Sequence, residues 1–236
     1  MKTFSINSEL FKIYQGLLVG YCLISNFNNS GEDEEVSSLL RSEESKVEAK
    51  FSNIEVNEYP SIAVWRDAYI RFGAKPKKYP SSIENLIKRN LKGNRLPHIN
   101  KLVDIYNYIS LKYLVPVGGE DLDKVEGDIQ LTIAGEDEVP VKLLGENEER
   151  PPYPNEVIYK DGIGTTCRRW NWKEADRTKL TEDTSNAIVV IELLPPVDTS
   201  SLEQALNELR ELITRSCGGE VRTGTLDESN QSVELV

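Results

Sequence analysis

Residues 102–127 read LVDIYNYISLKYLVPVGGEDLDKVEG, and this stretch holds a helix, its end and the start of a strand. In the first half, apolar side chains recur at spacings of three and four, which places them on one helical face: Leu102, Ile105, Tyr106, Ile109 and Tyr113. Asn100 is the expected N-cap. Proline lacks an N–H donor and glycine adopts open backbone conformations, so we expect the helix to end at Pro116, Gly118 and Gly119. The helix, a glycine hinge at these residues and the acidic turn that follows could form the floor of a pocket. The alternative is a core helix followed by a glycine-rich loop.

Two further helices are predicted before this stretch. Pro60 suits the first turn of a helix that ends at Gly73 and buries Ile62, Trp65, Tyr69 and Phe72. After a basic loop with two prolines, Ser81 and Glu84 form a capping box for a helix that ends at Gly93. We expect the helices between residues 60 and 113 to pack together.

Strands dominate the rest of the chain. Residues 1–29 contain apolar runs typical of strands, 128–134 and 139–143 predict two more, and Asp161-Gly162 is a turn signal between 156–159 and 163–169. The run 186–194, NAIVVIELL, indicates a buried strand, and an amphipathic helix starting near Ser200 covers the core. Because strands, consecutive helices and hairpins follow one another without strict βαβ alternation, we predict an α+β fold with a mainly antiparallel sheet flanked by helices. Residues 1–224 would form one domain and 225–236 a flexible acidic tail.

Composition excludes several classes of protein. The chain has 236 residues, 39% of them hydrophobic and 28% charged, as in an ordinary globular domain. It has no apolar run of 18 residues, so no membrane partner is expected. Three widely spaced cysteines and one histidine, His98, predict a reduced cytoplasmic protein without a metal site. No glycine-rich phosphate-binding motif occurs, and we expect no cofactor.

Charge is distributed unevenly along the chain. The net charge is −11, but residues 66–101 contain ten lysines and arginines against only Asp67 and Glu84, a local net charge of +8. Such a basic segment on an acidic protein is either a phosphate-contacting surface or a solvated helix face. The first interpretation makes these residues, together with two arginines further along, candidates for RNA binding: Arg66, Arg71, Lys75, Lys77, Lys78, Lys88, Arg89, Lys92, Arg95, Arg168 and Arg169.

Two features suggest a binding pocket. Cys167-Arg168-Arg169-Trp170-Asn171-Trp172 offers aromatic faces and an amide that can donate and accept, although core packing would explain the tryptophans as well. Glu192 is the one carboxylate in the apolar run 186–194. An unpaired buried charge is costly, so Glu192 either faces solvent at the strand end or is held by donors in a cleft.

The central stretch resembles the B3/B4 editing domain of the bacterial phenylalanyl-tRNA synthetase beta subunit, in which a similar segment runs from a helix into the editing cleft. The matching residues are Leu102-Val103-Asp104-Ile105, Asn107-Tyr108, Leu111, Pro116 and Asp121-Leu122-Asp123-Lys124. The segment WRDAYIRFGAKPKKYPSSIENLIKR, residues 65–89, and Trp170-Asn171-Trp172 resemble the free-standing members of this family. The resemblance covers about residues 60–219.

The resemblance implies several roles and includes two departures. It places the family's pocket glutamate on Glu192, which would recognise the polar end of a misacylated amino acid. The family's histidine falls on Gly118, and Trp170-Asn171-Trp172 replaces a Met-Gly-Gly turn beside the amino-acid pocket. Substrate-binding candidates are therefore Asn107, Trp170, Asn171, Trp172 and Glu192.

Three functions remain open at this point. The first is a free-standing editing hydrolase that deacylates a mischarged tRNA, with oxyanion-stabilising amides at Gly118 and Gly119. Its general base would be Glu120, Asp121 or Glu192, or a group on the substrate itself. The second is a non-catalytic module that binds tRNA or an amino acid on the same fold. The third is a small-molecule enzyme unrelated to tRNA. We expect Glu192, Trp170, Asn171, Gly118 and Gly119 to converge on one cleft.

Overall fold

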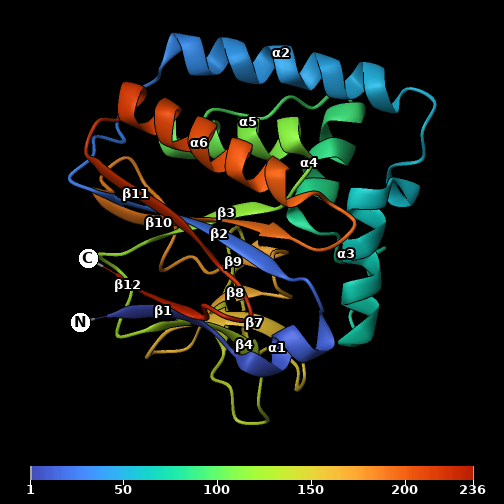
Figure 1. Ribbon diagram of the computed structural model, residues 1–236, viewed down its shortest axis with the longest axis vertical. Coiled ribbons are helices and arrows are strands. Elements are labelled where there is room, and N and C mark those ends of the chain that lie inside the picture. The colour runs from blue at the N-terminus through green and yellow to red at the C-terminus, as the bar shows by residue number, and fades with distance from the viewer. Residues whose placement is uncertain (1, 236) are drawn as a thin grey trace.

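Two β-sheets lie face to face beneath a layer of helices in the computed structural model, which describes residues 2–235 (Figure 1). The four-stranded sheet is antiparallel throughout, in the order β11 (Glu220–Leu226), β2 (Leu18–Ser25), β10 (Asn186–Leu193) and β3 (Val117–Asp121). The six-stranded sheet has the order β12 (Ser232–Glu234), β1 (Thr3–Ile6), β4 (Ile129–Ile133), β7 (Val157–Lys160), β8 (Thr165–Arg168) and β9 (Lys173–Glu174). Within it only β1 and β4 are parallel. Strands β5 (Val141–Lys142) and β6 (Glu149–Arg150) form a separate two-stranded antiparallel sheet.

The helices cover one face of the four-stranded sheet. Helix α2 (Glu34–Phe51) lies over α5 (Lys101–Tyr113) and α6 (Thr199–Ser216), which pack on the strands (Figure 1). Short helices α3 (Pro60–Arg71) and α4 (Ser82–Leu91) follow the 3-10 turn η1 (Val56–Glu58), and α1 (Ser8–Ile13) links β1 to β2. The predicted α+β fold with mainly antiparallel sheet and flanking helices is confirmed.

Strand β10 is buried on both faces, which explains its nearly continuous apolar sequence. Ala187, Val189 and Ile191 belong to the core beneath the helices, whereas Ile188 and Val190 belong to the core between the sheets. Successive side chains of a strand point to opposite faces, so Glu192 must point into the space between the two sheets.

Side chains near the helix ends satisfy the free backbone donors as expected. Asn100 accepts the Val103 N–H, and Ser81 accepts the Glu84 N–H. Helix α5 ends at Leu114, which takes a left-handed conformation (φ 55°), before Pro116 is reached. The Glu84 carboxylate does not complete the capping box, because it accepts from Arg66 and Lys88, each at 2.6 Å.

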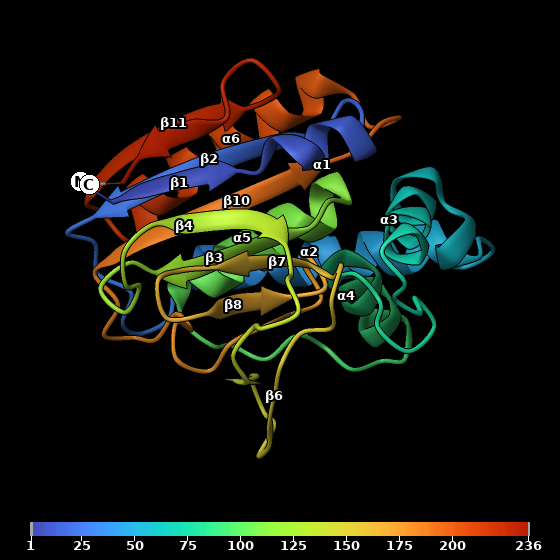
Figure 2. The same cartoon turned by 90° about the horizontal axis from the view of Figure 1, so that it is seen from below.

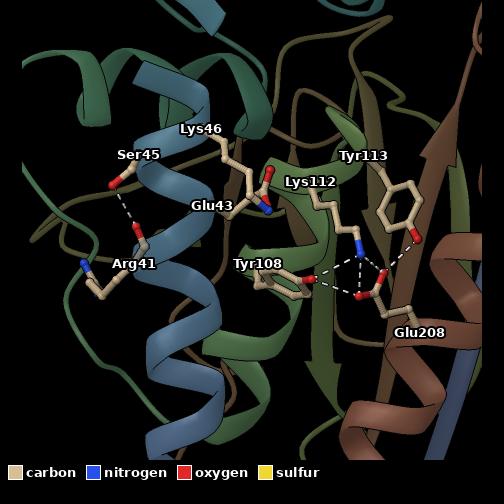
Figure 3. Close-up of polar contacts among 8 residues, drawn as sticks. All are labelled: Arg41, Glu43, Ser45, Lys46, Tyr108, Lys112, Tyr113 and Glu208. Carbon is tan, nitrogen blue, oxygen red and sulfur yellow. Dashed lines mark hydrogen bonds and ion pairs between the residues drawn. The ribbon is translucent and has the colours of Figure 1, made fainter. Parts of the chain in front are cut away.

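A cluster of polar side chains joins α5 to α6. Glu208 of α6 accepts the hydroxyl groups of Tyr108 at 2.9 Å and Tyr113 at 2.7 Å, and its carboxylate contacts Lys112 Nζ at 2.6 Å (Figure 3). A carboxylate with three donors holds the two helices in one register over the sheet.

Three sequence expectations need correction. Residues 8–13 form helix α1 and not a strand, because Asn7 caps them by accepting the Glu9 N–H. Gly118 and Gly119 lie within β3 and pair with Val190 and Val189, so they are not a hinge. Residues 225–235 are not a flexible tail: β11 extends to Leu226, β12 pairs with β1, and Leu235 is buried. The last strand also explains why the two chain ends lie together (Figure 2).

No helix within residues 2–235 is long and apolar enough to cross a membrane.

The contribution of β12 to stability is testable. Val233 packs against the core between the sheets, whereas its neighbour Glu234 is exposed. Val233→Ser should lower the free energy of unfolding by about 1 kcal/mol, through loss of buried apolar surface. The control Glu234→Ser should change it little. Urea denaturation measures both, and equal effects would mean that the terminal segment does not contribute to the core.

Candidate functional site

A cavity of about 320 Å³ lies between the two sheets. One wall is the inner face of β3 and β10, and the other comes from β1, β4, β7, β8 and β9; residues of α4 and α5 complete it. Three carboxyl groups line the cavity, those of Glu120, Glu174 and Glu192. The rest of the lining includes aromatic and apolar side chains: Phe4, Tyr106, Ile129, Tyr159, Trp170, Trp172, Ile188 and Val190.

Glu192 projects from β10 across the space between the sheets and is 2% exposed. Its Oε1 accepts the Tyr159 hydroxyl of β7 at 2.5 Å, and its Oε2 accepts Asn171 Nδ2 at 2.7 Å. Tyr69 of α3 in turn donates to Asn171 Oδ1 at 2.9 Å. Burial raises the pKa of Glu192 to about 7, and the donors from Tyr159 and Asn171 partly offset it. Of the two alternatives for this residue, the structure selects the carboxylate held by donors in a cleft.

The turn between β8 and β9 brings Trp170, Asn171 and Trp172 to the cavity. Arg169 and Trp170 both have positive φ, 49° and 65°, a conformation that side chains other than glycine rarely adopt. Glu156 holds the turn in place, since it accepts the Arg169 backbone N–H at 2.9 Å and binds the Arg168 guanidinium through two hydrogen bonds. Trp170 is fully buried against Trp65 and Tyr14, while Trp172 is partly exposed at the cavity.

Glu120 and Glu174 form a second acidic feature of the cavity. Burial raises the pKa of Glu174 to about 7, although the Gly119 N–H, donated to its Oε1 at 3.3 Å, acts in the opposite direction. Burial and the nearby Glu174 charge together hold the pKa of Glu120 well above its usual range. Within the described residues, Glu120 Oε2 is buried without a hydrogen-bond partner. Both carboxyl groups of this site therefore have raised pKa values, and burial is the main cause for each.

Position 118 is linked to Glu174 by geometry. A Cβ added at Gly118 would lie 3.0 Å from Glu174 Oε1, so the Glu174 carboxylate occupies the space into which a side chain at position 118 would extend. At Gly119 a Cβ would come within 2.9 Å of the Ile188 carbonyl oxygen, which backbone pairing fixes. The Gly119 N–H already binds Glu174, so the expectation that this amide is free to stabilise an oxyanion is wrong.

The expected convergence on one cleft occurs. Gly118, Gly119, Trp170, Asn171 and Glu192 all line the cavity, as do Asn107 and Trp172. Asp121 does not line it: its carboxylate accepts Thr184 Oγ1 and the Asp123 N–H in a turn at the end of β3. Of the candidate bases, Glu120 and Glu192 remain.

Glu174 is the site residue that the sequence analysis misses. It follows Trp172 by two positions, and its strand β9 has only two residues, too short for a recognisable alternating pattern. Extending the 156–169 hairpin by one strand would have identified it, since β9 places Glu174 opposite Cys167 of β8.

The basic candidates differ in exposure and in the groups that they contact. Arg168 and Arg169 are each 4% exposed beside Glu156. Arg66 and Lys88 are paired with Glu84. These four side chains are therefore not part of an open basic surface. Arg71 is exposed and donates to the Ile13 carbonyl oxygen at 3.2 Å. The remaining candidates are exposed and form no ion pair within residues 2–235: Lys75, Lys77, Lys78, Arg89, Lys92 and Arg95.

Across residues 2–235 no group of three or more histidine, cysteine, aspartate and glutamate side chains is arranged to hold a metal ion.

Comparisons with known proteins give one family. A family model described as the B3/4 domain matches residues 64–218. Among solved structures, an N-terminal fragment of the phenylalanyl-tRNA synthetase beta-subunit from Pyrococcus horikoshii is similar, with 12% sequence identity and a TM-score of 0.46. The match covers 93% of this chain and 50% of that one, so this chain spans half the length of the fragment. Comparison with curated proteins found no match.

The raised pKa of Glu192 predicts how stability depends on pH. A carboxyl group whose pKa rises from 4.5 to about 7 on folding stabilises the folded state below pH 4.5, and this stabilisation is lost as pH rises towards 7. Glu192→Gln should remove that component, so relative to wild type the variant should gain roughly 2–3 kcal/mol between pH 5 and pH 8. Denaturation at several pH values measures the difference, with the exposed Glu203→Gln as control. Parallel curves for wild type and Glu192→Gln would contradict the assignment.

Proposed function

The chain belongs to the B3/4 domain family, and we propose that it is a free-standing aminoacyl-tRNA editing protein that binds tRNA and hydrolyses a mischarged aminoacyl ester. One observation carries the proposal: Glu120 and Glu174 share an aromatic-walled cavity, burial raises the pKa of both carboxyl groups, and the Glu174 charge raises that of Glu120 further. A pair of this kind supplies an acid and a base at neutral pH.

The reaction follows from that division of roles. Water attacks the ester carbonyl carbon while the Glu174 carboxylate takes a proton from it. The carbonyl oxygen gains negative charge in the tetrahedral intermediate, and the bond to the ribose oxygen then breaks. The neutral Glu120 carboxyl group gives its proton to that leaving oxygen, so the products are the free amino acid and the tRNA. General acid–base help of this kind typically contributes about 10²–10⁴-fold in rate.

The remaining cavity residues would bind the amino-acid moiety. Trp172 and Tyr106 offer aromatic surface, and Asn107 and Asn171 offer amides. The Glu192 oxygens already accept hydrogen bonds from two protein donors. We therefore assign this carboxylate two roles: its negative charge attracts the substrate ammonium, and its hydrogen bond orients Asn171.

The exposed cations would bind the RNA backbone. Lys75, Lys77 and Lys78 lie in the loop before α4, whereas Arg89, Lys92 and Arg95 lie at its other end. The alternative function, a non-catalytic module that binds tRNA or an amino acid, uses the same surface and cavity. It gains support only if binding is found without hydrolysis.

A deacylation assay over a panel of mischarged tRNAs tests catalysis. We expect Glu174→Ala to lower the rate on the hydrolysed tRNA by about 10²–10⁴-fold, since the water loses its base. The wild-type rate should rise with pH towards 7 as the Glu174 carboxyl ionises. Gly118→His should recover activity best when combined with Glu174→Ala, because the carboxylate otherwise occupies the histidine's space. The exposed Glu182→Ala serves as control, and hydrolysis of no member of the panel would favour the non-catalytic module.

Salt dependence tests the RNA surface. Arg89→Glu with Lys92→Glu should weaken tRNA binding and reduce the slope of log affinity against log salt by roughly 1–2, because each phosphate contact releases counterions. A matched control reverses Arg210 and Arg215, which are exposed on α6. Equal losses from both pairs would indicate that only the net charge of the protein matters.

A further inference from the structure

A second cavity, of about 420 Å³, lies at the surface beside the β8–β9 turn. Its walls come from three separate segments: the loop after α3, the approach to β7, and the turn itself. Among the lining residues are three cations, Lys75, Lys78 and Arg169, and one anion, Glu156. On a chain whose net charge is −11, a hollow with more cations than anions favours an anionic ligand.

Arg169 is held at this cavity with spare hydrogen-bonding capacity. Its side chain is 4% exposed, and within residues 2–235 its Nη1 has no hydrogen-bond partner. The Glu156 carboxylate accepts hydrogen bonds from the Arg168 guanidinium and from the Arg169 backbone N–H. It lies 3.9 Å from Arg169 Nη2, which is beyond hydrogen-bond distance. A buried guanidinium with an unused N–H indicates that an acceptor is missing.

Two tyrosines add aromatic surface to the cations. The Arg169 guanidinium lies 3.7 Å from the centre of the Tyr79 ring, which Lys78 also approaches to 5.0 Å. The Lys78 ammonium, with a smaller effect from Arg169, lowers the pKa of the Tyr79 hydroxyl. Across the cavity Tyr153 is 65% exposed, so most of its ring remains available for stacking.

This second cavity adjoins the central one. Tyr79 lines the second cavity and Trp172 the central one, and their rings meet edge to face with centres 4.8 Å apart. Arg169 also packs on Trp172, at 4.5 Å. A ligand in the second cavity would therefore lie beside the wall of the carboxylate site.

We propose that the second cavity is a nucleotide-binding subsite, with a phosphate group at Lys75, Lys78 and Arg169 and a base stacked on Tyr153. Guanidinium and ammonium groups are the usual partners of phosphate, and an exposed aromatic ring stacks on any base. The nucleotide is either free or the end of an RNA chain. Only the second source rests on the proposed function, in which the aminoacyl ester at that RNA end would reach the central cavity.

Calorimetric titration of the full chain with AMP at low salt tests the proposal. Lys75→Ala with Lys78→Ala should weaken AMP binding about tenfold or more, since two charge-assisted contacts are lost. Tyr153→Ala should weaken AMP binding about fivefold or more but leave inorganic phosphate binding unchanged, because stacking requires a base. All three side chains are exposed, so these variants should fold normally.

Lys124→Ala is the matched control, because Lys124 is exposed but neither lines the cavity nor belongs to the proposed RNA surface. It should change AMP affinity by less than about twofold. The proposal is overturned if AMP and a short single-stranded RNA both fail to bind at millimolar concentration, if Lys124→Ala is as damaging as the double variant, or if Tyr153→Ala has no effect on AMP.

Comparison of ligands separates the two sources. Tighter binding of a trinucleotide RNA than of AMP, with the same sensitivity to Lys75 and Lys78, would identify an RNA end; equal affinity would identify a free nucleotide. Because binding is measured without an ester, a failure of deacylation leaves this result intact. Nucleotide binding that is absent while deacylation proceeds would overturn the subsite alone.

Discussion

The burial of the Glu192 carboxylate is the constraint on which the rest of the site depends. A carboxylate in the middle of an apolar strand needs donors, and the only side chains donating to it among residues 2–235 come from β7 and from the turn after β8. Tyr159 and Asn171 therefore hold the six-stranded sheet at a fixed place opposite β10, and Tyr69 extends the network to α3. The same contacts leave a space between the sheets at that point, and this space is the central cavity.

The position of Asn171 depends in turn on an unfavourable backbone. Consecutive positive φ values at Arg169 and Trp170 cost free energy, of order 1–3 kcal/mol each for residues of this kind. Burial of the Trp170 ring against Trp65 and the bonds from Glu156 to Arg168 and to the Arg169 backbone oppose that cost. A turn of this shape would suit glycines. Here the turn carries an arginine that lines the second cavity and an indole that lines the central one.

Local sequence patterns predicted most of the fold and part of the site. The spacing around Leu102 and Ile109, the caps at Ser81 and Asn100 and the apolar run of β10 are local signals, and each was confirmed. Gly118 and Gly119 were misread because glycine is as compatible with a close-packed edge strand as with a hinge, and only the approach of the Ile188 carbonyl decides. The burial of Arg168 and Arg169 was not foreseen, because Glu156, which pairs with Arg168, lies on another segment of the sheet. Charge in a sequence does not indicate whether it is buried.

The position of the Glu174 carboxylate depends on the glycine at position 118. A Cβ at position 118 would lie 3.0 Å from Glu174 Oε1, so a side chain there would require the carboxylate to shift from its observed position. Glycine at 118 therefore permits a carboxyl group to enter from the opposite sheet and to accept the Gly119 N–H. Burial is the main cause of the raised pKa of Glu120, and the entry of Glu174 raises it further, since two nearby carboxyl groups cannot both ionise readily. Glycine at position 118 thus leaves room for the Glu174 carboxyl group beside Gly119 in the central cavity.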